Sequence, residues 1–134
     1  MVFSIGLAAL ALAAGSAVAS ASPQGPWDPP VQDLSAAGQN ATQPRVTTGP
    51  DGAATAIWRR SNGTNNIIQA ATRPPGGSFS PPVDLSAPGQ DADAPQVVTA
   101  PDGTTTVVWQ RSDGANVIIQ ARTRPSGGSF GTTD

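Results

Sequence analysis

Apolar residues in this chain come in short runs, each closed by residues that are typical of turns. In the second half, residues 104–111 and 117–123 are rich in the β-branched and aromatic types that strands favour. Pro101-Asp102-Gly103 precedes the first of these runs and Ser112-Asp113-Gly114 separates the two, which is a strong hairpin signal. No window shows a helical period over a useful length. The pattern therefore predicts antiparallel strands joined by tight turns.

The second half of the chain repeats the first. Residues 84–134 align with residues 33–83 at an offset of 51 positions without a gap, and 30 of 51 residues are identical. Trp109 aligns with Trp58, and the two Pro-Asp-Gly turns coincide. A fixed period of this length is typical of repeat proteins, in which one supersecondary unit packs against copies of itself. Each copy is predicted to be a four-stranded meander, with strands at 96–100, 104–111 and 117–123 and a fourth exemplified by 79–85.

Adjacent apolar pairs indicate how these sheets are covered. Val107-Val108 and Ile118-Ile119 place apolar side chains on both faces, whereas a sheet with one wet face would alternate. Sheets buried on both faces, at roughly 50 residues per four strands, are typical of β-propeller blades. The predicted fold is all-β, with two tandem four-stranded antiparallel β-propeller-like blades that form an incomplete propeller. Trp58 and Trp109 are expected to pack between blades; a platform for stacking sugars is the alternative.

The chain begins with a segment that resembles an export signal. An apolar run at 2–14 is followed by small residues that permit cleavage after Ala19 or Ala21. Residues 1–21 are therefore predicted to be a signal peptide of a secreted or cell-surface protein, although no positive charge precedes the run; an N-terminal anchor is the alternative. Residues 22–32 are predicted to be a lead-in with a lone blade-closing strand, because 27–31 resembles 79–83. Residues 33–83 form the first repeat and 84–134 the second, incomplete one.

Composition excludes several kinds of chemistry. The sequence contains no Cys, His, Tyr, Lys or Glu, and its seven Arg and nine Asp give a net charge of −2. Zinc, haem and thiol chemistry are thus not expected, no cofactor or metal is predicted, and nucleic-acid binding lacks the basic surface that it requires. The preference for Arg over Lys and Asp over Glu fits a GC-rich bacterial genome.

Near the end of each copy the sequence resembles the Asp-box (BNR) repeat of sialidase-type propellers. That motif reads Ser/Thr-x-Asp-x-Gly-x-Thr-Trp/Phe; here the two segments are Thr72-Arg73-Pro74-Pro75-Gly76-Gly77-Ser78-Phe79 and Thr123-Arg124-Pro125-Ser126-Gly127-Gly128-Ser129-Phe130. Pro74 and Pro125 stand where the motif has its aspartate. The resemblance implies a propeller fold, in which this hairpin stabilises the blade far from any catalytic centre.

Candidate site residues cluster at the end of the second strand of each copy. Arg59, Arg60 and Arg111 lie where the loops of a propeller emerge and are able to grip a carboxylate or sulfate, with solvated rim residues as the alternative. The predicted binding set is completed by the two tryptophans, Trp58 and Trp109. Asp91 and Asp93 are the only close carboxylate pair, and a solvated loop is favoured over a catalytic pair or a cation site.

The predicted function is that of an exported, non-catalytic propeller repeat segment with a binding or structural role. Its expected partners are a glycan or a cell-surface protein. The resemblance implies a chemistry based on tyrosine and carboxylates, and the absence of Tyr and Glu argues against an enzyme; the alternative is the N-terminal part of a sialidase-like hydrolase whose catalytic residues lie elsewhere. A propeller needs at least four blades, so a longer parent chain, a ring closed by self-association, or an open stack must account for the rest.

Overall fold

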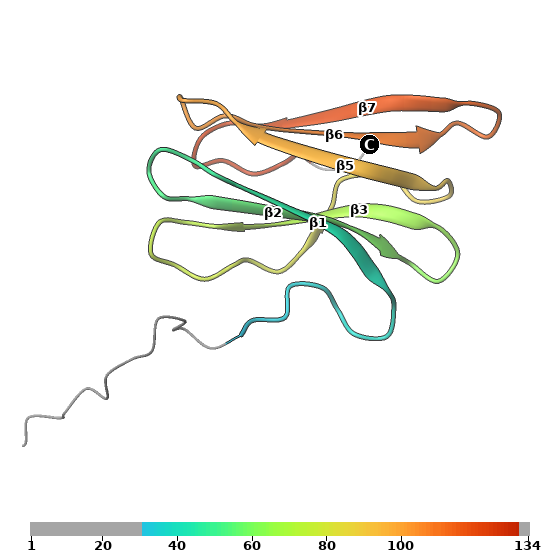
Figure 1. The fold of residues 1–134 in the computed structure, drawn as a ribbon, viewed down its shortest axis with the longest axis horizontal. Helices are drawn as coiled ribbons and strands as arrows, with labels where there is room; N and C mark the ends of the chain where they lie inside the picture. Colours follow the sequence, from blue (N-terminus) through green and yellow to red (C-terminus); the bar gives the residue numbers. More distant parts are fainter. Residues whose placement is uncertain (1–30, 132–134) are drawn as a thin grey trace, which may run out of the picture. The chain divides into compact units, whose positions relative to one another are not determined.

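The computed structural model describes residues 31–131, which form an all-β structure of two antiparallel sheets (Figure 1). The first sheet has the order β1-β2-β3-β4 and the second the order β5-β6-β7. The strands are β1 (Ala41–Thr48), β2 (Ala54–Ser61), β3 (Asn66–Arg73), β4 (Val83–Asp84), β5 (Ala92–Thr99), β6 (Thr105–Ser112) and β7 (Val117–Arg124). Both sheets lie in one unit, Gln32–Asp134. The expectation of an all-β meander in each copy is confirmed.

The predicted hairpin turns form where the sequence places them. Gly103 adopts φ 86°, a left-handed conformation that glycine reaches without a steric penalty. The Asp102 carboxylate accepts a hydrogen bond from the Thr104 N–H at 2.8 Å, so the turn between β5 and β6 carries its own side-chain cap. No helix that is long and apolar enough to cross a membrane occurs within residues 31–131.

Each sheet contains a β-bulge in its first strand. The sequence pattern does not predict these bulges. The register of β1 on β2 shifts between Thr42 and Arg45, and that of β5 on β6 shifts between Asp93 and Gln96. Gln43 and Ala94, which are equivalent in the repeat, adopt positive φ values of 55° and 49°. A left-handed conformation costs a residue with a side chain roughly 1 to 2 kcal/mol. Because the chain continues past the bulge, β5 begins earlier than the predicted residues 96–100.

The fourth strand is shorter than predicted. Instead of residues 79–85, only Val83–Asp84 pair with β3, opposite Ala70 and Gln69. The reason lies in Pro81 and Pro82, which have no N–H to donate to a ladder. The second sheet has three strands within the described residues. The predicted signal peptide at 1–21 and most of the lead-in at 22–32 lie outside the described residues.

The register assigns each side chain to one of two faces, because directly paired residues point to the same side of a sheet. We call the side that carries Trp58 in the first sheet and Trp109 in the second the Trp face, and the opposite side, with Ile68 and Ile119, the Ile face. Ile57 pairs with Ala70 and therefore lies on the Ile face of the first sheet. Val107 is two residues from Trp109 in β6 and lies on the Trp face of the second sheet.

The core is formed where the Ile face of the first sheet packs on the Trp face of the second. One buried cluster contains members from both sheets: Ile57, Ile68, Ala70, Leu85, Ala92, Val107, Trp109 and Phe130. Ile57, Ile68 and Val107 are fully excluded from solvent, at 0% exposure. The two copies are thus stacked head to tail, since opposite faces of equivalent sheets meet.

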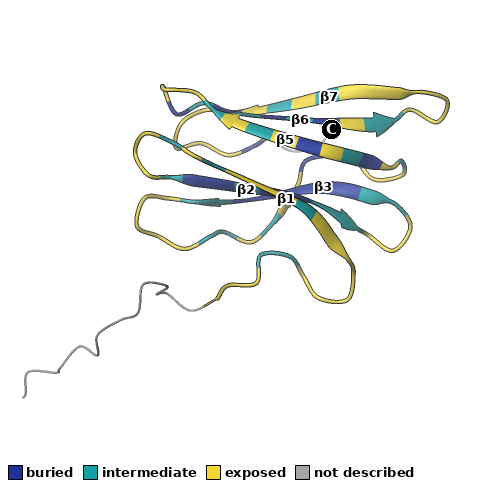
Figure 2. Ribbon diagram, viewed as in Figure 1, coloured by how far each residue is buried: buried dark blue, intermediate teal, exposed yellow. Residues whose placement is uncertain are grey.

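Burial on both faces is confirmed for the first sheet only (Figure 2). There, Ile67 and Ile68 point to opposite sides, yet are 4% and 0% exposed. Their equivalents Ile118 and Ile119 are 37% and 69% exposed. Ile68 and Ile119 differ because the second sheet covers the Ile face of the first, while no described segment covers the Ile face of the second. Ile67 and Ile118 lie on the Trp faces, and Ile118 is the more exposed of the two.

The equivalent positions Ile68 and Ile119 provide a matched test of this stacking. Ile68→Ala is expected to lower the free energy of unfolding by about 2 to 5 kcal/mol, the usual cost of an aliphatic truncation in a core. Ile119→Ala, at the same position of the other copy, is expected to cost less than about 1 kcal/mol because the side chain is exposed. Urea denaturation of both variants measures the two losses; equal losses would contradict the head-to-tail arrangement.

Candidate functional site

The two tryptophans of the predicted binding set are buried. Trp58 is 5% and Trp109 3% exposed. The Trp58 Nε1–H donates to Gln69 Oε1 at 3.2 Å, and the Gln69 amide donates in turn to Asp84 Oδ1 at 2.8 Å. As placed, neither ring offers a surface on which a sugar can stack. Trp109 belongs to the core between the two sheets, as expected for packing between repeats.

Two of the predicted arginines bind backbone carbonyls of their own copy. The Arg60 guanidinium donates to Ala36 O at 3.1 Å and to Ala37 O at 3.3 Å. Arg111 makes the equivalent bonds in the second copy, to Ala87 O at 3.4 Å and Pro88 O at 3.2 Å. Each arginine therefore fastens the loop that enters its sheet to the end of the second strand. Arg60 uses all three of its nitrogens in such bonds, whereas Arg111 uses Nη2 alone.

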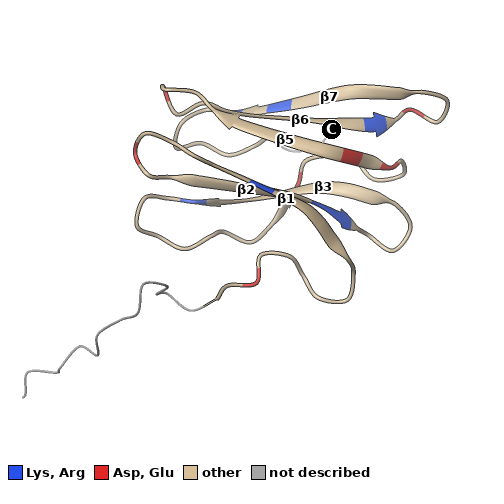
Figure 3. Ribbon diagram, in the orientation of Figure 1, with Lys and Arg blue, Asp and Glu red and all other residues tan. Residues whose placement is uncertain are grey.

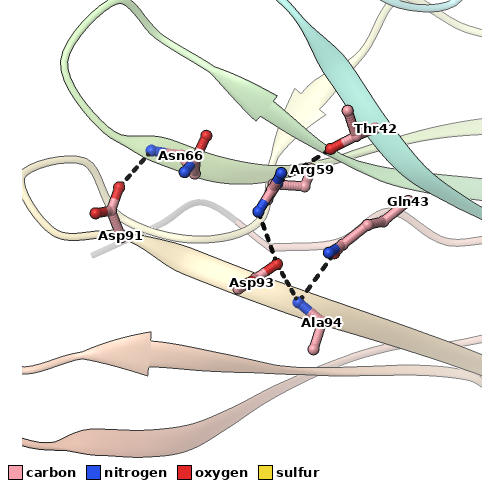
Figure 4. A network of polar contacts seen from close by, with 7 residues as sticks. All are labelled: Thr42, Gln43, Arg59, Asn66, Asp91, Asp93 and Ala94. Atoms are coloured by element: carbon pink, nitrogen blue, oxygen red, sulfur yellow. Dashed lines mark hydrogen bonds and ion pairs between the residues drawn. The ribbon is translucent and has the colours of Figure 1, made fainter.

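The third arginine joins the two copies (Figure 4). Arg59 on β2 forms an ion pair with Asp93 on β5, with Nη1 3.1 Å from Oδ1, and its Nε–H donates to Thr42 Oγ1 at 3.1 Å. The pair is partly exposed: the Arg59 and Asp93 side chains retain 27% and 47% of their accessible surface. A pair in this setting contributes modestly to stability, but it fixes how β5 lies against the first sheet.

Two further hydrogen bonds between the copies, Ala94 N–H to Gln43 and Asn66 N–H to Asp91, extend this junction on either side of the ion pair. The Ala94 N–H, at the bulge of β5, is within 3.1 Å of Gln43 Oε1, which belongs to the equivalent bulge of β1, and within 2.8 Å of Asp93 Oδ1. The Asp91 carboxylate accepts the Asn66 N–H at the start of β3 at 2.8 Å. The bulges therefore place polar groups of both copies opposite one another (Figure 4).

This role of Asp91 and Asp93 corrects the expectation of a solvated loop. Both carboxylates keep contact with solvent, but each also bonds to a residue of the first sheet: Asp91 to Asn66 and Asp93 to Arg59. The sequence does contain a signal for this contact, in the positions at which the copies differ. Arg59 is replaced by Gln110 in the second copy, while Asp91 and Asp93 are replaced by Asn40 and Thr42 in the first. The cation thus occurs only in the first copy and the carboxylates only in the second, and the fold brings them together.

Several contacts hold the Asp93 carboxylate in its charged form. Partial burial acts to raise the pKa of Asp93, but it is outweighed by hydrogen bonds from the Ala94 N–H and the Gln43 side chain and by the charge of Arg59. The pKa of Asp93 consequently lies below its usual value.

A second polar contact between the copies involves Arg124, from the segment that resembles the Asp-box. Arg124 is 7% exposed and donates to Thr55 Oγ1 of the first sheet at 3.1 Å and to Gly128 O of its own turn at 3.0 Å. Its guanidinium carbon lies 5.8 Å from the centre of the Phe130 ring, and the equivalent Arg73 lies 5.4 Å from Phe79. Arginine and aromatic ring are therefore part of a structural turn in both copies.

The five predicted residues do not converge on one pocket. Trp58 and Arg60 lie on the Trp face of the first sheet, away from the second sheet. Arg59 lies on the Ile face of the first sheet, and Trp109 and Arg111 on the Trp face of the second, which are the two faces that meet in the junction. One apolar hollow of the first sheet is lined by Leu34, Ala41, Pro44 and Trp58, without a charged side chain. Charged residues are distributed over both sheets (Figure 3), and within residues 31–131 no three acidic side chains gather as a metal site would require.

No protein-family model matches this chain, and no curated protein or solved structure matches it either. The resemblance to Asp-box repeats therefore remains a prediction from short motifs.

The Asp93 junction predicts a defined pH dependence. Asp93→Asn is expected to lower the free energy of unfolding at pH 7 by about 0.5 kcal/mol, as for a partly exposed pair. Because the pKa is lowered in the folded state, this stabilisation is complete above the unfolded value of about 3.9 and disappears as the pH falls through the folded pKa. The difference between wild type and variant should thus close in acid.

Thermal unfolding between pH 7 and pH 2 measures that difference. Asp33→Asn is the matched control, since Asp33 is an exposed carboxylate and none of the hydrogen bonds or ion pairs described involves it; it should leave stability unchanged at every pH. A gap for Asp93→Asn that does not narrow as the pH falls from 7 to 2 would refute the assignment.

Proposed function

We propose that this chain is an exported, non-catalytic segment of a β-propeller-type repeat protein with a binding or structural role, in which the two sheets are successive blades. The observation that carries the proposal is the head-to-tail packing of the Ile face of the first sheet on the Trp face of the second. Because each copy has both faces, this mode of packing continues with every added copy. An array of blades is built by such packing of the Ile face of one copy on the Trp face of the next.

The surface of the second sheet supports the existence of further units. Val108, Ile119 and Ala121 on its Ile face are the counterparts of Ile57, Ile68 and Ala70, which are buried in the junction. Val98 and Ile119 on this face are nonetheless 62% and 69% exposed. Large apolar side chains exposed on one face of a sheet favour an interface there. We infer that another blade covers it, from a longer parent chain or by self-association.

Non-catalytic function is supported by the side chains that the chain has and by what they contact. Sequence composition leaves no Tyr, Glu, His, Cys or Lys to act as nucleophile or proton donor at neutral pH. Arg59, Arg60 and Arg111 are bonded to the protein itself. A ligand such as a glycan or a surface protein would therefore bind at loops between strands, with the sheets as a rigid support.

A lengthened chain tests the stacking directly. A further copy of residues 84–134 is added after Asp134, and Ile119→Arg is made in both the native and the lengthened chain. In the native chain the substitution should cost less than about 1 kcal/mol, because Ile119 is exposed. In the lengthened chain it would bury an unpaired charge and should cost about 3 to 5 kcal/mol. Denaturant titration measures both; equal costs would argue against a covered Ile face.

Activity and binding are tested separately on the same protein. With fluorogenic sialosides and other aryl glycosides we expect no release above the enzyme-free rate, with an authentic sialidase as positive control. Release that scales with protein concentration would favour the hydrolase interpretation instead. On a glycan array, reproducible binding would support recognition of sugars, and its absence would favour a surface-protein ligand or a spacer role.

A further inference from the structure

The outer edge of β3 shows how this fold receives an additional strand. Beyond the two paired residues of β4, the Leu85 N–H donates to Ile68 O at 2.7 Å, and the Ile68 N–H donates to Ser86 Oγ at 2.9 Å. Asp84 accepts the Gln69 amide at 2.8 Å, and Leu85 is 1% exposed in the core. The segment Val83-Asp84-Leu85-Ser86 thus binds through backbone, carboxylate, apolar side chain and hydroxyl together.

The outer edge of β7 has the same receiving groups. Ile68-Gln69-Ala70 of β3 recurs as Ile119-Gln120-Ala121 in β7. Ile119 lies opposite Gln110 in the same register as Ile68 opposite Arg59, so its N–H and C=O also point away from the sheet. Within residues 31–131 no strand pairs with this edge, and Val117 and Ile119 are 68% and 69% exposed.

A buried donor at this site lacks the partner that its equivalent has. The Trp58 Nε1–H bonds to Gln69, whose amide is oriented by Asp84. Trp109 is only 3% exposed, yet its Nε1–H has no acceptor among the described residues. Gln120 lies opposite Trp109 in the position to accept it, but within residues 31–131 no carboxylate accepts the Gln120 amide as Asp84 accepts that of Gln69. An unsatisfied buried N–H is costly, and a carboxylate that orients Gln120 would relieve it.

We propose that the outer edge of β7 is a binding site for an extended strand with the sequence Val-Asp-Leu-Ser, supplied by another copy of this repeat. Its aspartate would orient Gln120 toward Trp109, its serine would accept the Ile119 N–H, and its leucine would lie beside Ile119 on the Ile face, as Leu85 lies beside Ile68 in the first sheet. A strand without the acidic residue satisfies the backbone only. The site therefore selects its ligand by side chains in addition to main-chain pairing.

A peptide with the sequence of residues 82–87, Pro-Val-Asp-Leu-Ser-Ala, acetylated and amidated, is the probe. It is titrated into the full-length ¹⁵N-labelled chain. We expect saturable changes in the amide signals of Ile119, Gln120 and Ala121, together with a downfield shift of the Trp109 indole N–H. The Trp58 indole signal should stay in place, because its own chain already supplies Asp84.

Two controls separate this site from general strand pairing. The same peptide with Asn in place of Asp should bind about tenfold more weakly, the effect of losing one charge-assisted hydrogen bond. The Gln120→Ala chain should still bind the Asp peptide through its backbone, but without the shift of Trp109. The proposal is overturned if saturating peptide leaves Trp109 unmoved in the wild type, if both peptides bind equally, or if the changes map to the edges formed by β1 and β5.

Discussion

The packing of one copy's Ile face on the other copy's Trp face is the interaction on which this structure depends. Ile57 and Ile68 of the first sheet share one buried cluster with Val107 and Trp109 of the second, whereas Trp58 and Ile67 are buried on the other face of the first sheet. Removal of such side chains from water is the main source of stability in a domain this small. The cluster that both sheets build therefore couples the stability of one repeat to the presence of the other.

Polar contacts then determine which copy lies next to which. Arg59 meets Asp93, and Arg124 meets Thr55, so each copy contributes a cation to the other at a different point of the junction. The Arg59–Asp93 pair cannot recur at the equivalent positions of the repeat, because Gln110 stands in place of Arg59 and Thr42 in place of Asp93. The apolar faces, which are nearly the same in both copies, stabilise the junction. The few positions at which the copies differ distinguish one copy from the other in that junction. This division is the one expected for specificity in an otherwise repetitive surface.

Much of the fold follows from local sequence, and much of the junction does not. Turn residues and β-branched runs place the hairpins correctly, since Pro-Asp-Gly and Ser-Asp-Gly specify their own dihedral angles. The bulges at Gln43 and Ala94 were missed, because neither residue type signals a left-handed conformation. Their place at strand ends predicts arginines that bind a ligand, whereas Arg60 and Arg111 bind carbonyls 23 and 24 residues away in sequence. Contacts of that range depend on the folded arrangement, which periodicity alone does not describe.

The most direct measurement of the central claim is a set of nuclear Overhauser contacts from the ring of Trp109 in the full-length chain. The account predicts contacts to the methyl groups of Ile57 and Ile68, which share its buried cluster, and none from the ring of Trp58 to the methyl groups of β6. Contacts of Trp109 confined to β6 and β7, with Ile57 and Ile68 silent, would show that the two sheets do not stack head to tail and would contradict the account.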